Sequence, residues 1–243
     1  MEQNNLIIRK PTPEDDLEKI AELLYNTDPY IYPYWFESVE KCRKELAPLL
    51  LEDKFFFSLK NLYISIEPTD NEIVGVVCIL DKNCDLSYDY SELKKKNERY
   101  AFTIENYIEG LIKEVKEADF AYISNVCVDA NYRGRHIGKT MLDYVIDIYK
   151  KKLYDHIVLD VLAENPGAIK LYQNLGFEQF TEIFKGFNDP KKKRPDVFSM
   201  ESKIKNRWMK SILFFRHKNN TFFVRFISVV KWKNISYLEY YLL

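Results

Sequence analysis

The stretch VCVDANYRGRHIGKTML at residues 126–142 decides the fold, because an apolar strand, a short basic turn and a helix start follow one another in it. Residues 120–128 (FAYISNVCV) have a strand pattern, and residues 137–150 carry apolar side chains at helical spacing. The turn between them contains Gly134 and Gly138. Small residues let backbone N–H groups approach a ligand, and a helix N-terminus adds free donors and partial positive charge. We therefore predict an anion site, suited to a phosphate or pyrophosphate.

Basic side chains strengthen this prediction and other phosphate motifs do not compete with it. Arg133, Arg135 and Lys139 lie in or beside the turn, where they would pair with phosphate oxygens. The turn is not a Walker loop, because GxxxxGK[ST] is absent. It is not the dinucleotide fingerprint either, because GxGxxG is absent.

Working outward from the turn, strand and helix patterns are interleaved along the chain, which predicts a mixed α/β (α+β-like) fold with a sheet flanked by helices. Further strands are predicted at residues 6–10, 61–67, 72–80, 156–162, 177–184 and 197–204. Further helices are predicted at residues 15–25 (with Thr12 or Asp15 as cap), 38–52 (with Pro48 as a candidate kink) and 166–174, with helix-prone sequence at 81–117. Residues 27–36, broken by Pro29 and Pro33, are predicted to form a loop.

Composition sets the broad class of protein. The chain has 243 residues, of which 47% are hydrophobic and 30% charged, which is ample for a buried core and too apolar for disorder. It has no apolar run of the roughly 18 residues that a spanning helix needs and no signal-peptide pattern at its start. Four cysteines without a CxxC pair, and three histidines, argue against a structural zinc site. We expect no metal and a reduced, cytoplasmic protein.

A second motif follows the turn. Residues 133–138 (RGRHIG) resemble the acyl-CoA-binding motif [QR]-x-x-G-x-[GA] of the GNAT superfamily of N-acetyltransferases. Residues 163–177 (AENPGAIKLYQNLGF) resemble its second signature, N-x-x-A-x-x-L-Y-x-x-x-G-F. The resemblance covers residues 6–204, so we expect a GNAT domain over 1–204 and an extension over 205–243. It implies a mixed, mostly antiparallel sheet, splayed at the acyl-CoA site, and transfer of an acetyl group from acetyl-CoA to a small-molecule amine or a protein amino group.

The resemblance also implies which residues bind acetyl-CoA. Strand amides would pair with the pantetheine arm, turn amides would hold the pyrophosphate, and two residues of the second motif would contact the arm and the sulfur. The predicted residues are Val126, Cys127 and Val128 on the strand, Arg133, Gly134, Arg135, His136, Ile137, Gly138 and Lys139 in the turn, and Asn165 and Tyr172 beyond it. His136 departs from the family, which usually has glycine there, so its side chain must point away from the phosphates or the turn must open.

The resemblance implies catalytic roles as well. Tyr172 would protonate the departing thiolate, and the amide of Val128 would stabilise the tetrahedral oxyanion. Asp160, twelve residues before Tyr172, occupies the place of the base in some family members, including ribosomal-protein acetyltransferases. As an acid on a strand expected to be covered on both faces, it would be costly unless paired. Asp89, Glu164 and a water chain without a single base are the alternatives. In the structural interpretation, Asp160 is tied to a neighbouring backbone group or an arginine. Cys127 is expected to pack, so transfer would be direct.

Aromatic residues are expected to wall the acceptor site. Tyr30, Tyr32, Tyr34 and Trp35 would hold an amine through cation–π or stacking contacts, or would cap the core. Asp89 lies in an acidic insert that would favour cationic acceptors as a lid, or would be a solvated surface.

The end of the chain differs from the rest. Residues 203–243 hold nine basic residues, one acid and ten aromatics, a balance of +8 against −9 for the first 202 residues. A membrane-surface or nucleic-acid arm, a dimerising or sheet-extending segment, and an extension without function are the competing interpretations. Two rival functions remain. The protein could be an acyl-CoA-binding module without turnover, or a protein recruited to nucleic acid or membrane by this tail. A homodimer is a further expectation, because dimers are common in the family that the chain resembles.

Overall fold

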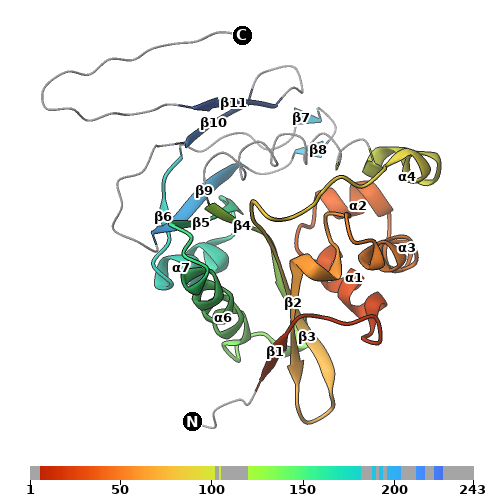
Figure 1. Cartoon of the computed structure of the whole chain (residues 1–243), viewed down its shortest axis with the longest axis horizontal. Coiled ribbons are helices and arrows are strands. Elements are labelled where there is room, and N and C mark those ends of the chain that lie inside the picture. The colour runs from red at the N-terminus through yellow and green to blue at the C-terminus, as the bar shows by residue number, and fades with distance from the viewer. Residues whose placement is uncertain are drawn as a thin grey trace, which may run out of the picture.

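One seven-stranded sheet organises the molecule (Figure 1). The computed structural model describes residues 6–101, 104, 120–181, 188–189, 192–193, 196–203, 212–216 and 222–226. The strand order is β1-β2-β3-β4-β5-β9-β6, and only β4 and β5 pair in parallel. The bounds are Ile7–Arg9 (β1), Leu62–Glu67 (β2), Glu72–Leu80 (β3), Phe120–Val128 (β4), His156–Leu162 (β5), Glu178–Gln179 (β6) and Val197–Lys203 (β9). The predicted mixed, mostly antiparallel sheet is confirmed.

Helices cover both faces of the sheet. On one side lie α1 (Leu17–Tyr25), α2 (Ile31–Phe36) and α3 (Val39–Leu46); on the other lie α6 (Ile137–Lys151) and α7 (Pro166–Asn174) (Figure 1). Each side has its own apolar cluster, the first built with Leu24, Phe36 and Leu46 and the second with Met141 and Val145. Alternation along the strands supplies both clusters: Val76 joins the first and Val77 the second.

The structure corrects three local predictions. Residues 31–36 form helix α2 rather than loop, because Pro33 lies in the first turn, where a helix needs no N–H from it. The cap of α1 is Asp16, whose side chain accepts from the amide of Lys19, rather than Thr12 or Asp15. The helix predicted over residues 38–52 is not one kinked helix: it divides into α3 and a 3-10 turn at Ala47–Leu51, which contains Pro48, the candidate kink.

Two further segments are only partly described. In the helix-prone stretch 81–117 the structure describes α4 (Ser91–Lys96), while residues 102–103 and 105–119 lie outside the described residues. The strand predicted at 177–184 is β6 alone, since residues 182–187 lie outside them. Short pairs link β7 (Asn188–Asp189) to β8 (Lys192–Lys193), and β10 (Ile212–Arg216) to β11 (Phe222–Phe226). Among the described residues, no helix is long and apolar enough to cross a membrane.

Candidate active site

Strands β4 and β5 part in the middle of the sheet. Their parallel pairing runs from Phe120↔His156 to Ile123↔Leu159 and stops there, although β4 continues to Val128. The parting begins beside a bulge in β4, where Cys78 pairs with Asn125 and Ile79 pairs with Ile123. Such a bulge bends the strand that carries it. The splay that the family resemblance implies is therefore present.

Backbone groups of β4 face this gap. The amide of Asp129 donates to the carbonyl of Val74 on β3, at 2.9 Å. Because successive residues of a strand turn their N–H groups to opposite edges, Cys127 also faces β3, whereas Val126 and Val128 face the gap left by β5. The gap thus presents two backbone N–H groups to an extended ligand, and Cys127 contributes side-chain packing rather than an amide there. Burial raises the pKa of the Cys127 thiol to about 11, which makes it a poor nucleophile.

The turn after β4 offers further donors. Its backbone reverses through Gly134 (φ +80°) and His136 (φ 61°), two residues in the left-handed region. His136 is the N-cap of α6, and no side chain caps the first amides of that helix. A Cβ built on Gly134 would have no atom within 4 Å, so the turn is open. His136 is exposed, as expected, and its positive φ explains why glycine suits this position.

The three basic side chains of the turn have different contacts. Arg133 donates from Nε to the carbonyl of Val128 at 3.2 Å, so it lies back over the end of β4. Arg135 stacks on the ring of Tyr132, 4.8 Å from the centroid. Lys139 forms an exposed ion pair with Asp143 at 2.6 Å. All three residues are solvent-accessible in part, so their charges remain available to an anion at the turn.

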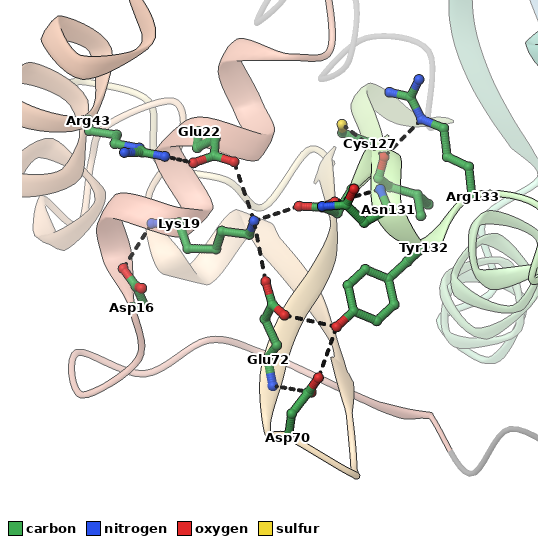
Figure 2. Close-up of polar contacts among 12 residues, drawn as sticks. Asp16, Lys19, Glu22, Arg43, Asp70, Glu72, Cys127, Asn131, Tyr132 and Arg133 are labelled. Carbon is green, nitrogen blue, oxygen red and sulfur yellow. Dashed lines mark hydrogen bonds and ion pairs between the residues drawn. The ribbon is translucent and has the colours of Figure 1, made fainter.

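An ion-pair network fixes the start of the turn to α1 (Figure 2). Lys19 Nζ lies 2.5 Å from Asp129 Oδ2, 3.3 Å from Glu22 and 3.7 Å from Glu72. Burial alone would raise the pKa of Asp129, but its pKa is lowered, because Lys19 and the amide of Asn131 favour the charged form. Lys19 was not predicted from the sequence, where its spacing marked only the polar side of a helix.

The same network reaches the β2–β3 hairpin and α3. The Tyr132 hydroxyl lies 2.9 Å from a carboxylate oxygen of Asp70 and 2.8 Å from one of Glu72. Arg43 of α3 pairs with Glu22 (Figure 2). The turn that would hold the pyrophosphate is therefore tied to helices on the opposite side of the sheet.

Helix α7 carries the second motif. Asn165 is its N-cap, with Oδ1 accepting from the amide of Ala168 at 3.0 Å, which leaves the side-chain NH₂ as a donor. Tyr172 lies on its inner side against Phe177, with ring centroids 6.0 Å apart. Burial raises the pKa of Tyr172 to about 12, so the phenol stays protonated at neutral pH. Gly176 (φ +84°) lies just past the helix end, as predicted.

Asp160 is exposed, which corrects the expectation of a buried acid. It is the first residue of β5 beyond the pairing with β4, and the next residue, Val161, is buried on the other face. Its Oδ2 accepts from the Tyr122 hydroxyl at 3.1 Å and its Oδ1 from the Ser199 hydroxyl at 2.5 Å. Alternation places Asp160 on the face of Val158 and of α1–α3, whereas Tyr172 belongs to the apolar cluster of the other face.

The aromatic residues predicted to wall the acceptor site separate into two groups. Tyr32 and Trp35 are buried in the core, with ring centroids 5.1 Å apart, which fits the core-capping alternative. Tyr30 and Tyr34 are partly exposed. Tyr30 donates from its hydroxyl to Glu164, in the turn after β5, and this bond raises the pKa of Tyr30. The segment before α2 is thus joined to the turn before α7.

Two further residues bear on the acceptor side. Asn125, which follows the bulge, donates to Thr27 Oγ1 at 2.8 Å and to Tyr32 Oη at 3.0 Å, and so pins the corner between α1 and α2 to β4. Nothing in the sequence pattern had indicated this residue. Asp89 is exposed and accepts from the amide of Ser91 at 2.9 Å, at the start of α4. The described residues hold no group of three His, Cys, Asp or Glu side chains that could bind a metal.

Comparison with known proteins shows the family to which the chain belongs. Residues 24–177 match the family model "Acetyltransferase (GNAT) family", and the chain belongs to that family. Among similar curated proteins, [ribosomal protein bS18]-alanine N-acetyltransferase of Escherichia coli is 36% identical over 63 residues, 26% of this chain and 43% of that enzyme. N-alpha-acetyltransferase 30 of Saccharomyces cerevisiae is 33% identical over 64 residues, 26% of this chain and 36% of that enzyme.

Solved structures share the fold over a longer stretch. An N-acetyltransferase from Staphylococcus aureus Mu50 is similar over 80% of this chain and 99% of its own, with a TM-score of 0.56 and 19% identity. At that identity the likeness shows the fold alone. In sequence, this chain spans less than half the length of the curated relatives that it matches.

Proposed function

We propose that the protein is an N-acetyltransferase that moves an acetyl group from acetyl-CoA directly to an amine. The observation that carries the proposal is the gap in which the N–H groups of Val126 and Val128 face away from β3. An extended pantetheine arm would pair with them as an added strand. Its pyrophosphate would then reach the uncapped amides of α6.

The two candidate proton-transfer groups lie on opposite faces of the sheet, so each would reach the reacting atoms from its own side. An ammonium acceptor arriving from the side of α1–α3 loses one proton to Asp160. Its nitrogen bonds to the thioester carbon, and the N–H of Val128 stabilises the oxyanion. The C–S bond breaks, the thiolate takes a proton from Tyr172, and the remaining excess proton on nitrogen restores the phenol through solvent.

We propose the α-amino group of a protein or peptide as the acceptor. The two curated relatives reported above are named for acetylating a ribosomal-protein alanine and for N-alpha-acetylation. In this chain the acceptor side is bounded by Tyr30 and Glu164, and Asp160 lies exposed on the same face. A carboxylate at this place favours a cationic amine through charge attraction.

Binding is tested first, by thermal-shift titration with acetyl-CoA. A ligand that binds only the folded protein raises the melting temperature in a saturable way. We expect this shift in the wild type and in Tyr144→Trp, a control on the exposed side of α6. Gly138→Trp should abolish it, because a Cβ at Gly138 already lies 3.5 Å from Val128 and 3.6 Å from Leu171, so the indole would fill the space between the end of β4 and α7. If Gly138→Trp shows the same shift as the wild type, the pyrophosphate does not bind at this turn. If the wild type shows no shift, acetyl-CoA is not the donor.

Turnover is tested by release of free CoA thiol with two matched peptides. One has a free α-amino group and no lysine; the other has a blocked N-terminus and one lysine. We expect turnover of the first at least about tenfold faster, and a fall of about 10²-fold in kcat for Tyr172→Phe. Equal rates would overturn the α-amino proposal, and binding of acetyl-CoA without turnover of any amine would overturn the enzymatic one.

A further inference from the structure

Three strands meet at the carboxylate of Asp160. Tyr122 comes from β4 and Ser199 from β9, and each donates to a different oxygen of Asp160, at 3.1 and 2.5 Å. Ser199 pairs directly with Asp160 between β9 and β5. Tyr122 pairs with Val158, which lies two residues before Asp160 on β5 and on the same face of the sheet. The contact therefore spans the point where β4 and β5 part.

The two hydroxyl donors are themselves held in place. Ser199 has no exposed surface and Tyr122 only 5%. The amide of Ser199 donates to Thr181 Oγ1 at 2.8 Å, and its carbonyl accepts from the amide of Phe180 at 3.2 Å. Because the two donors are buried and held in place, they restrict the two side-chain torsions of Asp160, while its carboxylate stays exposed.

We propose that Tyr122 and Ser199 are positioning residues, which hold the Asp160 carboxylate in one orientation at the open end of the gap, where the acceptor amine would arrive. This inference rests on the proposed function, in which Asp160 takes the proton. One hydroxyl bonds to each oxygen, so the two hydrogen bonds together restrict rotation of the carboxylate. A base that turns freely would lose rate through misplacement alone.

The hydroxyls also favour the ionised carboxylate, so their removal has a readout in pH. Among the described residues, the Tyr122 phenol and the Ser199 hydroxyl bond to Asp160, and Glu164, four residues further on, is bonded to Tyr30. A base works only when deprotonated, so activity falls at low pH. Loss of a donor makes protonation easier and moves this acidic limb toward higher pH.

The test compares Tyr122→Phe and Ser199→Ala with two controls. Tyr100→Phe and Ser65→Ala remove buried hydroxyls that have no hydrogen-bond partner. All variants are assayed with the same acceptor peptide. In Tyr122→Phe and Ser199→Ala we expect kcat to fall about 3- to 30-fold and the midpoint of the acidic limb of the pH–activity profile to move up by about half a pH unit or more. The KM for acetyl-CoA should stay within about twofold. Ser199→Thr, which keeps the hydroxyl, should retain the wild-type limb.

The outcomes separate this inference from the proposed function. Asp160→Asn should lower kcat by about 10²-fold or more and remove the limb that depends on a base. Suppose that Asp160→Asn has this effect, while Tyr122→Phe and Ser199→Ala match their controls in kcat and in the acidic limb of the pH profile. The positioning role of the two hydroxyls is then overturned, and Asp160 remains the base. If Asp160→Asn keeps the wild-type rate and limb, the base itself is wrong. An acetyl-CoA thermal shift on each variant confirms that it is folded.

Discussion

His136 holds a conformation that an L-residue adopts only at a cost. Its φ of 61° lies in the left-handed region, where a side chain costs about 1 kcal/mol and glycine costs nothing. We therefore expect His136→Gly to raise the free energy of unfolding by about 0.5–1 kcal/mol, measured by urea denaturation without ligand. Arg135→Gly, at the adjacent exposed residue without a positive φ, is the control and should lower it. A loss of stability in His136→Gly would show that its side chain stabilises the turn.

Asp160 shows what a single residue reveals before its structure is known. Its spacing from Tyr172 and its place on the strand were readable in the sequence. The apolar run around it, however, predicted cover on both faces, and the structure exposes it. The reason is that cover depends on which distant elements pack over each face: at this point of β5 Val161 is buried on one face, whereas Asp160 on the other is exposed. Tyr122 and Ser199 went unpredicted for the same reason, since their contacts with Asp160 join residues 38 and 39 positions apart.

Helix α1 and the end of β4 are joined by a largely buried ion pair. The side chains of Lys19 and Asp129 are 17% and 9% exposed. Removing one partner of such a pair leaves the other charge poorly solvated. We expect Lys19→Met to lower the free energy of unfolding by about 2–4 kcal/mol and to raise the KM for acetyl-CoA more than it lowers kcat, because Asp129 holds the start of the turn.

The matched control for this element is Lys139→Met. Lys139 also pairs with one aspartate at 2.6 Å, but both side chains are 48% exposed. An exposed pair of this kind contributes about 0.5 kcal/mol or less. Urea denaturation of both variants measures the difference. Equal losses would mean that the Lys19 pair is screened by solvent and does not anchor the turn.

Elements with a strong local signal were predicted well. The bounds of β4, β5 and α7 agree with those expected, because apolar runs, a proline at the first turn and Gly176 mark them. Helix α2 was missed because Pro33 was taken as a breaker, although its position in the first turn is compatible with a helix. Pro48 marked the interruption after α3, but periodicity does not show that the chain continues there as a 3-10 turn.

At the scale of the molecule, family membership accounts for the sheet and the gap, but not for the contacts between distant segments. The bond from Tyr30 to Glu164 and the network around Lys19 each join loops or helices more than 100 residues apart. A homodimer, a cytoplasmic location and the division at residues 204–205 stay predictions. The structure bears on the proposed division, because β9 ends at Lys203, and Lys203 pairs with His156 of β5.

That pairing sets where the chain can be shortened. Removal of residues 203–243 would take Lys203 from β9, so the cut belongs after Ile204. Strands β10 and β11 pair with each other and with no strand of the seven-stranded sheet. We therefore expect a chain of residues 1–204 to keep the free energy of unfolding within about 0.5 kcal/mol, the acetyl-CoA thermal shift and the kcat of the full chain. A chain cut after Asp196 should not fold, because it lacks β9, including the residues that pair with Asp160 and His156. If the 1–204 chain is insoluble or loses the shift, the basic, aromatic tail is part of the folded domain rather than an addition to it.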